Sequence, residues 1–250
     1  MRKIQFYLTP AAGKALIGKA FAALPDVQEA VREHTVVVVA GTTDAAVAYE
    51  LLKSIGQEEG FSAKRFFRGL TVPAGTSAEA DFIGDVVIRN GEWLKGKTIY
   101  DVAEELGKGD ICFKGANVVN LVSGEAGVLM ASPVGGTVMP LLTAVYGKRA
   151  KLYVPTGVEK RVDAPIAQLV NMVNDPQAEG LRLAPLPGEV VTEIEAIAIL
   201  SGARAVLMAA GGVLGAEGGA YFTAEGTDEE LAALRKALDE VKKEPLFSLS

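Results

Sequence analysis

One stretch of the sequence decides the fold: Thr35-Val36-Val37-Val38-Val39-Ala40-Gly41-Thr42-Thr43-Asp44. Its first part is an unbroken β-branched run, which is typical of a strand buried on both faces, as in parallel sheets. The run ends at a glycine, and the residues after it predict a helix that stops near Gly56. A buried strand that passes through a loop into a helix is the repeating unit of α/β folds.

The same order of strand, loop and helix recurs along the chain. We predict strands at 35–40, 85–89, 110–113, 127–131, 151–154, 181–183, 203–209 and 220–223, and helices at 10–24, 99–106, 138–146, 168–173, 192–200 and 228–243. Asn90-Gly91 predicts a hairpin with a type I′ turn. Thr98 with Asp101 and Thr227 with Glu230 have capping-box spacing.

These elements predict an α/β protein with an open, mostly parallel, Rossmann-like sheet covered by helices on both faces. The pattern of the sequence changes after Pro155, where Pro185 and Pro187 mark a break. We therefore expect a core domain made of 1–155 and 226–250, with a small α+β lid subdomain at 156–225.

Composition excludes several classes of function. The 250 residues are 49% hydrophobic and 22% charged, which is a globular composition. A net charge of −6 argues against nucleic acid, and no apolar run approaches the roughly 20 residues of a membrane helix. The N-terminus lacks signal-peptide features, so a cytoplasmic protein is expected. With one cysteine (Cys112) and one histidine (His34), we expect no disulfide, no metal site and no cofactor, and we interpret both residues as structural.

Three glycine-bearing loops are expected where ligands bind in parallel sheets, at the carboxyl ends of strands. Gly41-Thr42-Thr43 and Gly135-Gly136-Thr137 each precede a predicted helix, whose free N–H groups and dipole favour an anion. The alternative for the first loop is that Thr43 or Asp44 caps the helix, and for the second it is again a helix cap, with a tight turn. The third loop is Lys114-Gly115-Ala116-Asn117.

Two charged residues are candidates for catalysis. Lys114 ends a core strand, where it could hold a phosphate or become a nucleophile if burial lowers its pKa; it could instead extend outward into solvent. Glu217 is the lone carboxylate in the loop Gly211–Gly219, which is either a lid with a general base or a hairpin connection with a solvated Glu. Glu189, Glu193 and Glu195 are expected on a solvated face.

The order and spacing of the three loops resemble ribose-5-phosphate isomerase type A, and more widely its superfamily with glucosamine-6-phosphate deaminase and CoA-transferases. Gly41-Thr42-Thr43 is similar to that isomerase's Gly-Thr/Ser-Gly-Ser-Thr loop. The segment 114–120 is similar to its Asp-Gly-Ala-Asp-Glu-x-Asp loop in position and in its Gly-Ala centre, and Gly135-Gly136-Thr137 to its Lys-Gly-Gly-Gly-Gly loop. Leu186–Val191 resembles the segment that opens the family's lid, so the resemblance extends over most of the chain from Thr35.

The departures from this family bear on function. Its substrate-binding and catalytic aspartates fall on Lys114, Asn117 and Asn120, and its third-loop lysine is replaced within Ser132-Pro133-Val134. The helix Val138–Tyr146 holds no glutamate. An aldose–ketose isomerase needs a base to move a proton between adjacent carbons. Ordinary ribose-5-phosphate isomerase activity is therefore not expected.

The sequence leaves three functional hypotheses. The first is a small-molecule enzyme on this isomerase-like fold that binds a phosphorylated or carboxylated metabolite, with Lys114 and Glu217 as its catalytic residues. The expected ligand-binding residues are Gly41, Thr42, Thr43, Gly115, Asn117, Gly135, Gly136 and Thr137. The second is a non-catalytic metabolite sensor on the same fold, and the third is CoA-transferase-like acyl transfer through Glu217. The expected partner is a small anionic metabolite, and by analogy alone the chain is a possible homo-oligomer.

Overall fold

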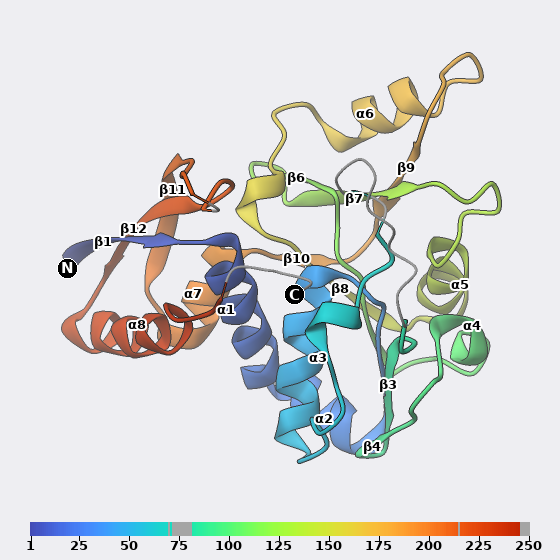
Figure 1. The fold of residues 1–250 in the computed structure, drawn as a ribbon, viewed down its shortest axis with the longest axis horizontal. Coiled ribbons are helices and arrows are strands. Elements are labelled where there is room, and N and C mark those ends of the chain that lie inside the picture. Colours follow the sequence, from blue (N-terminus) through green and yellow to red (C-terminus); the bar gives the residue numbers. More distant parts are fainter. Residues whose placement is uncertain (70, 72–81, 215, 246–250) are drawn as a thin grey trace.

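The computed structural model describes residues 1–69, 71, 82–214 and 216–245, and in these the chain is a mixed α/β protein (Figure 1). Its strands are β1 (Arg2–Leu8), β2 (Thr35–Val38), β3 (Val86–Arg89), β4 (Glu92–Trp93), β5 (Ile111–Phe113), β6 (Val118–Asn120), β7 (Glu125–Met130), β8 (Lys151–Pro155), β9 (Arg182–Leu186), β10 (Glu189–Val191), β11 (Arg204–Ala210) and β12 (Ala220–Gly226). Its α-helices are α1 (Pro10–Ala23), α2 (Pro25–Glu33), α3 (Thr42–Ser54), α4 (Ile99–Val102), α5 (Val138–Leu142), α6 (Ile166–Val173), α7 (Glu193–Ser201) and α8 (Asp228–Val241). Short 3-10 helices span Ala63–Arg65 and Val158–Lys160, and a π-helical turn spans Thr143–Gly147.

The largest sheet has the strand order β10-β8-β5-β2-β3-β4. Its first four strands are parallel, and β3 and β4 add to it antiparallel, so the predicted mostly parallel sheet is confirmed in its core. The predicted hairpin is β3–β4, with Asn90 and Gly91 at φ of 51° and 79°. Positive φ at both central residues is what a type I′ turn requires.

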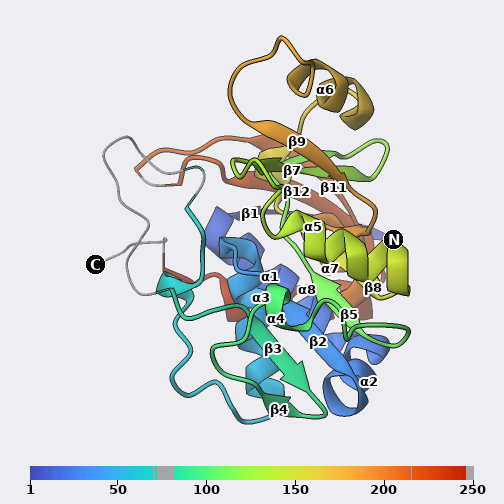
Figure 2. The same cartoon turned by 90° about the vertical axis from the view of Figure 1, so that its right-hand side faces the viewer.

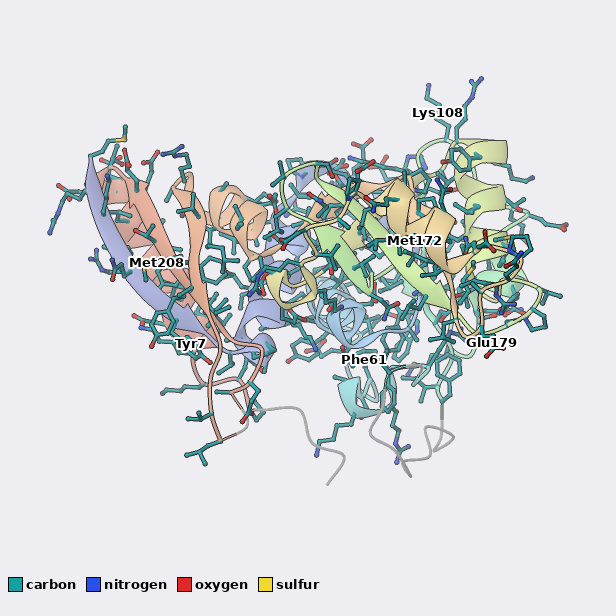
Figure 3. The ribbon with its side chains drawn as sticks, turned by 90° about the horizontal axis from the view of Figure 1, so that it is seen from above. Tyr7, Phe61, Lys108, Met172, Glu179 and Met208 are labelled. Atoms are coloured by element: carbon teal, nitrogen blue, oxygen red, sulfur yellow. The ribbon has the colours of Figure 1, made fainter. Side chains whose placement is uncertain are left out.

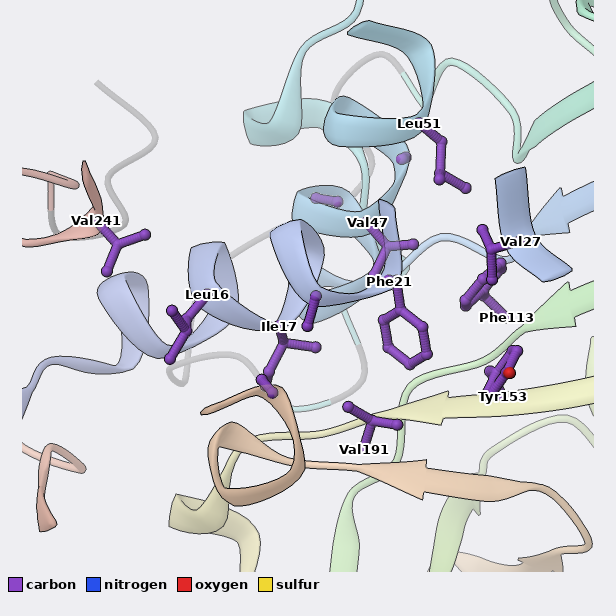
Figure 4. Close-up of a cluster of buried hydrophobic side chains, with 14 of the residues drawn as sticks. Leu16, Ile17, Phe21, Val27, Val47, Leu51, Phe113, Tyr153, Val191 and Val241 are labelled. Atoms are coloured by element: carbon purple, nitrogen blue, oxygen red, sulfur yellow. The ribbon is translucent and has the colours of Figure 1, made fainter. Parts of the chain in front are cut away.

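Strand β2 is buried on both faces, as its unbroken valine run predicts. Val36 and Val38 belong to one hydrophobic cluster, and Val37 and Val39 to a second. Figure 4 shows part of the first cluster, in which the ring of Phe21 from α1 meets strands β5 and β8. Alternating side chains of this segment are thus buried in two separate clusters, so β2 lies between them.

The strand directions place one set of loops at a single edge of this sheet. Because β2, β5, β8 and β10 are parallel, the segments after them (39–44, 114–117, 156–160 and 192–195) leave the sheet at the same edge. Antiparallel β3 begins at that edge, so Asp85 lies there as well. The sheet thereby brings polar residues together from distant parts of the sequence.

Two small antiparallel sheets flank the large one (Figures 1 and 2). The first, β1-β12-β11, packs with α7 and α8; the second, β6-β7-β9, carries α6. Figure 3 shows them well apart, with Tyr7 and Met208 on the first and Met172 on α6. The hairpin of β11 and β12 and the capping boxes at Thr98 and Thr227 match the sequence predictions.

The pairing of strands joins the segments expected to form the core domain with the segment expected to form the lid. Strand β1 pairs with β12, and β10 joins the large sheet although it lies in the segment 156–225. Strand β7 also lies outside the large sheet, so the expectation that all three glycine loops follow its parallel strands is wrong for the loop 133–137. The reason is a turn in which Oδ1 of Asn120 accepts hydrogen bonds from the N–H groups of Val122 and Ser123, which folds β6 back onto β7.

Helices α1 and α3 approach each other closely at Gly18, so a larger side chain at this position should lower the stability of the fold. A Cβ atom at this position would lie 2.5 Å from the carbonyl oxygen of Ala46. Gly18→Ala is therefore expected to lower the free energy of unfolding by about 1–3 kcal/mol through overpacking. Gly147→Ala is the matched control in urea unfolding, because a Cβ at Gly147 would meet nothing within 4 Å and should leave stability unchanged or raised. Equal stability of the two variants would contradict this packing.

Candidate functional site

A cavity of about 670 Å³ opens at the polar edge of the large sheet. All three glycine-bearing loops line it: Gly41–Thr43, Lys114–Asn117 and Gly135–Thr137. Four cationic side chains of the described residues line it with them, namely Lys14, Arg68, Lys114 and Lys160. The volume is within the range of small-molecule sites, and the charge favours an anion.

The Gly-Thr-Thr loop does not use its side chains to cap α3. The N-cap residue is Gly41, and no side-chain capping hydrogen bond is present, so the interpretation of Thr43 or Asp44 as a cap is wrong. Instead, Oγ1 of Thr42 accepts a hydrogen bond of 2.9 Å from Nζ of Lys14, and Oγ1 of Thr43 accepts one of 3.5 Å from Nζ of Lys160. The loop therefore gathers ammonium groups around the start of a helix.

Asp44 is the feature of the site that the sequence analysis missed. Asp44 is one of the residues that line the cavity, and it is only 1% exposed. Oδ2 accepts a hydrogen bond of 3.0 Å from the N–H of Gly115, whereas Oδ1 has no partner among the residues that the structure describes. A Cβ at Gly41 would collide with this carboxylate, and one at Gly115 would lie 2.5 Å from it. Both glycines are therefore explained by the room that Asp44 needs.

Burial raises the pKa of the Asp44 carboxyl to about 6. The ammonium groups of Lys114 and Lys160 and the N–H of Gly115 oppose the rise, because they stabilise the carboxylate. A pKa near 6 leaves the group able to give and take a proton near neutral pH. This is a property of catalytic acids and bases.

Lys114 is 9% exposed, so the alternative of a lysine that extends into solvent is wrong. Its backbone N–H continues the sheet by donating to the carbonyl of Tyr153 at 3.1 Å. No carboxylate of the described residues lies within 4.0 Å of its Nζ. Burial lowers the pKa of Lys114, while the carboxylates of Asp44 and Asp85 act to raise it. The negative charge of Asp44 thus acts on Lys114, although these two side chains form no ion pair.

The remaining cations are held by partners at the rim. Arg68 donates to Oδ1 of Asp85 at 2.8 Å, and Asp85 is itself buried and accepts from the backbone of Ala40 and Ile99. Burial lowers the pKa of Lys14, and the neighbouring ammonium of Lys160 lowers it further. Sequence spacing could not reveal these residues, because they come from a helix and loops that only the fold brings together.

Glu193 departs from the expected solvated face. It is 3% exposed, and its Oε2 accepts a hydrogen bond of 2.8 Å from the N–H of Val158. Burial, and then the charge of Glu159, raise the pKa of Glu193 to about 7. Glu195 instead completes the capping box with Thr192. The position of α7 directly after β10, at the polar edge, is the signal that could have identified Glu193.

The Gly135-Gly136-Thr137 loop reaches the cavity from the β6-β7-β9 sheet. Gly135 and Gly136 have φ of 78° and 57°, so the tight-turn interpretation describes their backbone. Thr137 is buried and makes no side-chain capping bond. In the neighbouring loop, Oδ1 of Asn117 accepts a 3.0 Å hydrogen bond from the N–H of Leu129, which ties this loop to β7.

Glu217 is not brought to this site. It is exposed and is absent from the described residues that line the cavity. Its neighbour Gly218 lies against Pro10 and the side chain of Glu159 instead. The cavity's own carboxylate is Asp44, which belongs to the first loop.

Comparison of this chain with known protein families, with curated proteins and with solved structures finds no match. In the part of the chain that the structure describes, none of the helices has the length and apolar character of a membrane span, and three or more His, Cys, Asp or Glu side chains do not come together as metal ligands.

Proposed function

We propose that this protein is a small-molecule enzyme that binds a phosphorylated or carboxylated metabolite in the cavity at the polar edge of its large sheet. The observation that carries the proposal is the buried carboxylate of Asp44, which has one oxygen without a partner among the described residues and belongs to a residue that lines the same cavity as four cationic side chains. Cationic side chains alone would bind any small anion. The buried carboxyl of Asp44 adds a group that can exchange a proton with the bound molecule.

Recognition of the anion follows from the wall of the cavity. The free N–H groups at the start of α3 and the hydroxyl groups of Thr42 and Thr43 are donors at its rim. Lys14 and Lys160 place positive charge beside those hydroxyl groups. Charge-assisted hydrogen bonds of this kind are the strong contacts to phosphate and carboxylate groups.

Proton transfer is assigned to Asp44 and Lys114. The family that the sequence resembles needs a base, and the expected positions lack one. Asp44 supplies a carboxyl with a pKa of about 6 within the same cavity. In this proposal, Asp44 and Lys114 therefore take the acid–base role that the sequence hypothesis gave to Glu217. The resemblance to a Rossmann-like isomerase fold, with helices on both faces of the sheet, stays part of this proposal.

A non-catalytic sensor would need the cations and glycines but not an acid with an unsatisfied oxygen. Leaving a buried polar atom without a partner costs stability, on the order of 1–3 kcal/mol. Such a cost is typical of groups kept for chemistry. This feature of Asp44 favours the enzyme over the sensor.

Anion-dependent thermal stabilisation tests the binding. At a concentration of 100 times its dissociation constant, a bound anion should add about 2.7 kcal/mol, or about 5–10 °C in melting temperature. We expect Lys114→Glu to abolish this increase for inorganic phosphate, sugar phosphates and small carboxylates, because it puts a carboxylate into the cavity.

The matched control is Lys108→Glu. Lys108 precedes β5, the strand that Lys114 follows, and its side chain points into solvent at the other end of that strand (Figure 3). This variant should keep the full stabilisation. If Lys114→Glu does not fold, Lys114→Met replaces it. Unchanged stabilisation in the Lys114 variants, or none in the wild type, would contradict the proposal.

A further inference from the structure

We infer that Lys114 is a nucleophile that forms an imine with the carbonyl carbon of its substrate, and that Asp44 exchanges the protons of this step. The inference rests on the proposed function, since it names the class of substrate that the cavity takes: a small aldehyde or ketone that carries a phosphate or carboxylate group.

The surroundings of Lys114 suit a nucleophilic amine. Its side chain is buried, it lines the cavity, and its Nζ makes no ion pair with the described residues. An amine attacks only when it is neutral, and removal from water favours the neutral form. The charges that face it come from several elements: Asp44 on α3 and Asp85 before β3 favour the ammonium, and Arg68 and Lys160 oppose it.

The surroundings of Asp44 suit proton exchange beside that amine. The N–H of Gly115, the residue after Lys114, holds Oδ2, so the position of the carboxyl is tied to the chain next to the nucleophile. Oδ1 is buried and has no hydrogen-bond partner among the described residues, and Asp44 is one of the residues that line the cavity. Oδ2 is therefore held by the backbone, and Oδ1 is the oxygen to which the inference assigns the exchanged proton.

The atoms and electrons of imine formation balance with Lys114 and Asp44 as the two reacting side chains. The Nζ lone pair of Lys114 forms a C–N bond to the carbonyl carbon, and the electron pair of the C=O bond moves to oxygen, which takes the proton of the Asp44 carboxylic acid. The resulting carboxylate takes a proton from nitrogen and returns it to the hydroxyl group. The C–O bond then breaks, water leaves, and the nitrogen electron pair forms the C=N bond. No oxidant, reductant or metal is needed.

The other cavity residues define the rest of the substrate. The cations Lys14 and Lys160 sit beside the threonines of the first loop, whereas Lys114 follows the adjacent strand β5. An anionic group held by the first loop can place a carbonyl carbon of the same small molecule beside Lys114. A phosphate and a carboxylate satisfy this chemistry equally, so the experiment includes both.

Borohydride trapping tests the inference. The full chain is incubated with one of two probes, the keto phosphate dihydroxyacetone phosphate or the 2-oxo acid pyruvate, and is then reduced with sodium borohydride. We expect one adduct per chain, with the mass of the probe less one oxygen, mapped by peptide mass spectrometry to Lys114. The probe that gives it identifies the anionic group.

Three variants sharpen the result. Lys114→Arg keeps the positive charge but cannot form an imine, and should give no adduct in the cavity. Lys108→Arg removes an exposed lysine and should leave trapping unchanged. Asp44→Asn should slow trapping by about 100-fold, the usual size of general acid–base assistance, while Lys114 stays in place.

The outcomes separate this inference from the proposed function. If neither probe labels Lys114 in the wild type above the level of other lysines, while inorganic phosphate still stabilises the protein against heat, the imine is wrong and the anion site stands. If phosphate gives no stabilisation, the proposed function is wrong. Peptide mapping of the wild type decides the question even if a variant does not fold.

Discussion

Replacing Phe21 by alanine is expected to lower the free energy of unfolding by about 4 kcal/mol, within the range measured for large core side chains. The ring of Phe21 is fully buried and meets the rings of Phe113 and Tyr153 edge-on, with centroids 5.0 and 5.1 Å away (Figure 4). These contacts join α1 to the two central parallel strands β5 and β8. Alanine would leave a cavity that the surrounding strands cannot close.

Urea unfolding of Phe21→Ala beside Tyr146→Ala measures this effect. Tyr146 is 71% exposed, so removal of its ring should change stability by no more than about 0.5 kcal/mol. A loss of less than about 1 kcal/mol for Phe21→Ala would mean that α1 does not pack on the strands in this way. Because α1 also supplies Lys14 to the cavity, the same variant should weaken anion-dependent stabilisation.

The parts of the fold that are set locally were predictable from the sequence. The valine run of β2, the Asn90-Gly91 turn and the capping box at Thr227 each depend on neighbouring residues, and the structure has all three. Strand β1 was not predicted, because it is a strand only through its pairing with β12, which is more than 200 residues away in sequence. Pairing at that distance leaves no local signal.

The glycine-bearing loops of the candidate site were predictable from the sequence, but its buried charged side chains were not. The three glycine loops were identified, and they line one cavity. Glu193 was interpreted as a solvated residue, and capping by Asp44 was left open as the alternative to an anion-binding loop, since a carboxylate in the first turn of a helix is ordinarily exposed. Burial of both depends on loops from other strands, the backbone N–H of Gly115 for one and of Val158 for the other. Such contacts exist only in the folded chain.

Replacing Asp44 by asparagine is expected to raise the free energy of unfolding by about 3 kcal/mol above pH 7. The pKa of this carboxyl is about 6 in the folded protein against an ordinary value of 3.8 for aspartate, and each pKa unit corresponds to about 1.4 kcal/mol. A raised carboxyl pKa means that the folded state binds the proton more tightly. Its stabilising contribution is complete below about pH 4 and is lost as pH rises through about 6.

Asparagine resembles the protonated acid, so the two proteins should be equally stable near pH 4 and diverge between about pH 4 and 6. Urea unfolding at pH 4, 5, 6 and 8 measures the divergence. Asp239→Asn is the control, because Asp239 is exposed on α8 and its replacement should change stability by less than about 1 kcal/mol at every pH.

The Asp44→Asn variant should be more stable than the wild type at pH 8 and should form the imine more slowly. If Asp44 served only as the counter-charge of Lys114, its removal would leave a buried ammonium without compensation and would lower stability at pH 8. A carboxyl kept for proton transfer is instead a cost to the folded state, which the variant removes together with the trapping reaction. A variant that is less stable than the wild type at pH 8 would therefore contradict the assignment of Asp44 as an acid–base group, whatever its effect on trapping.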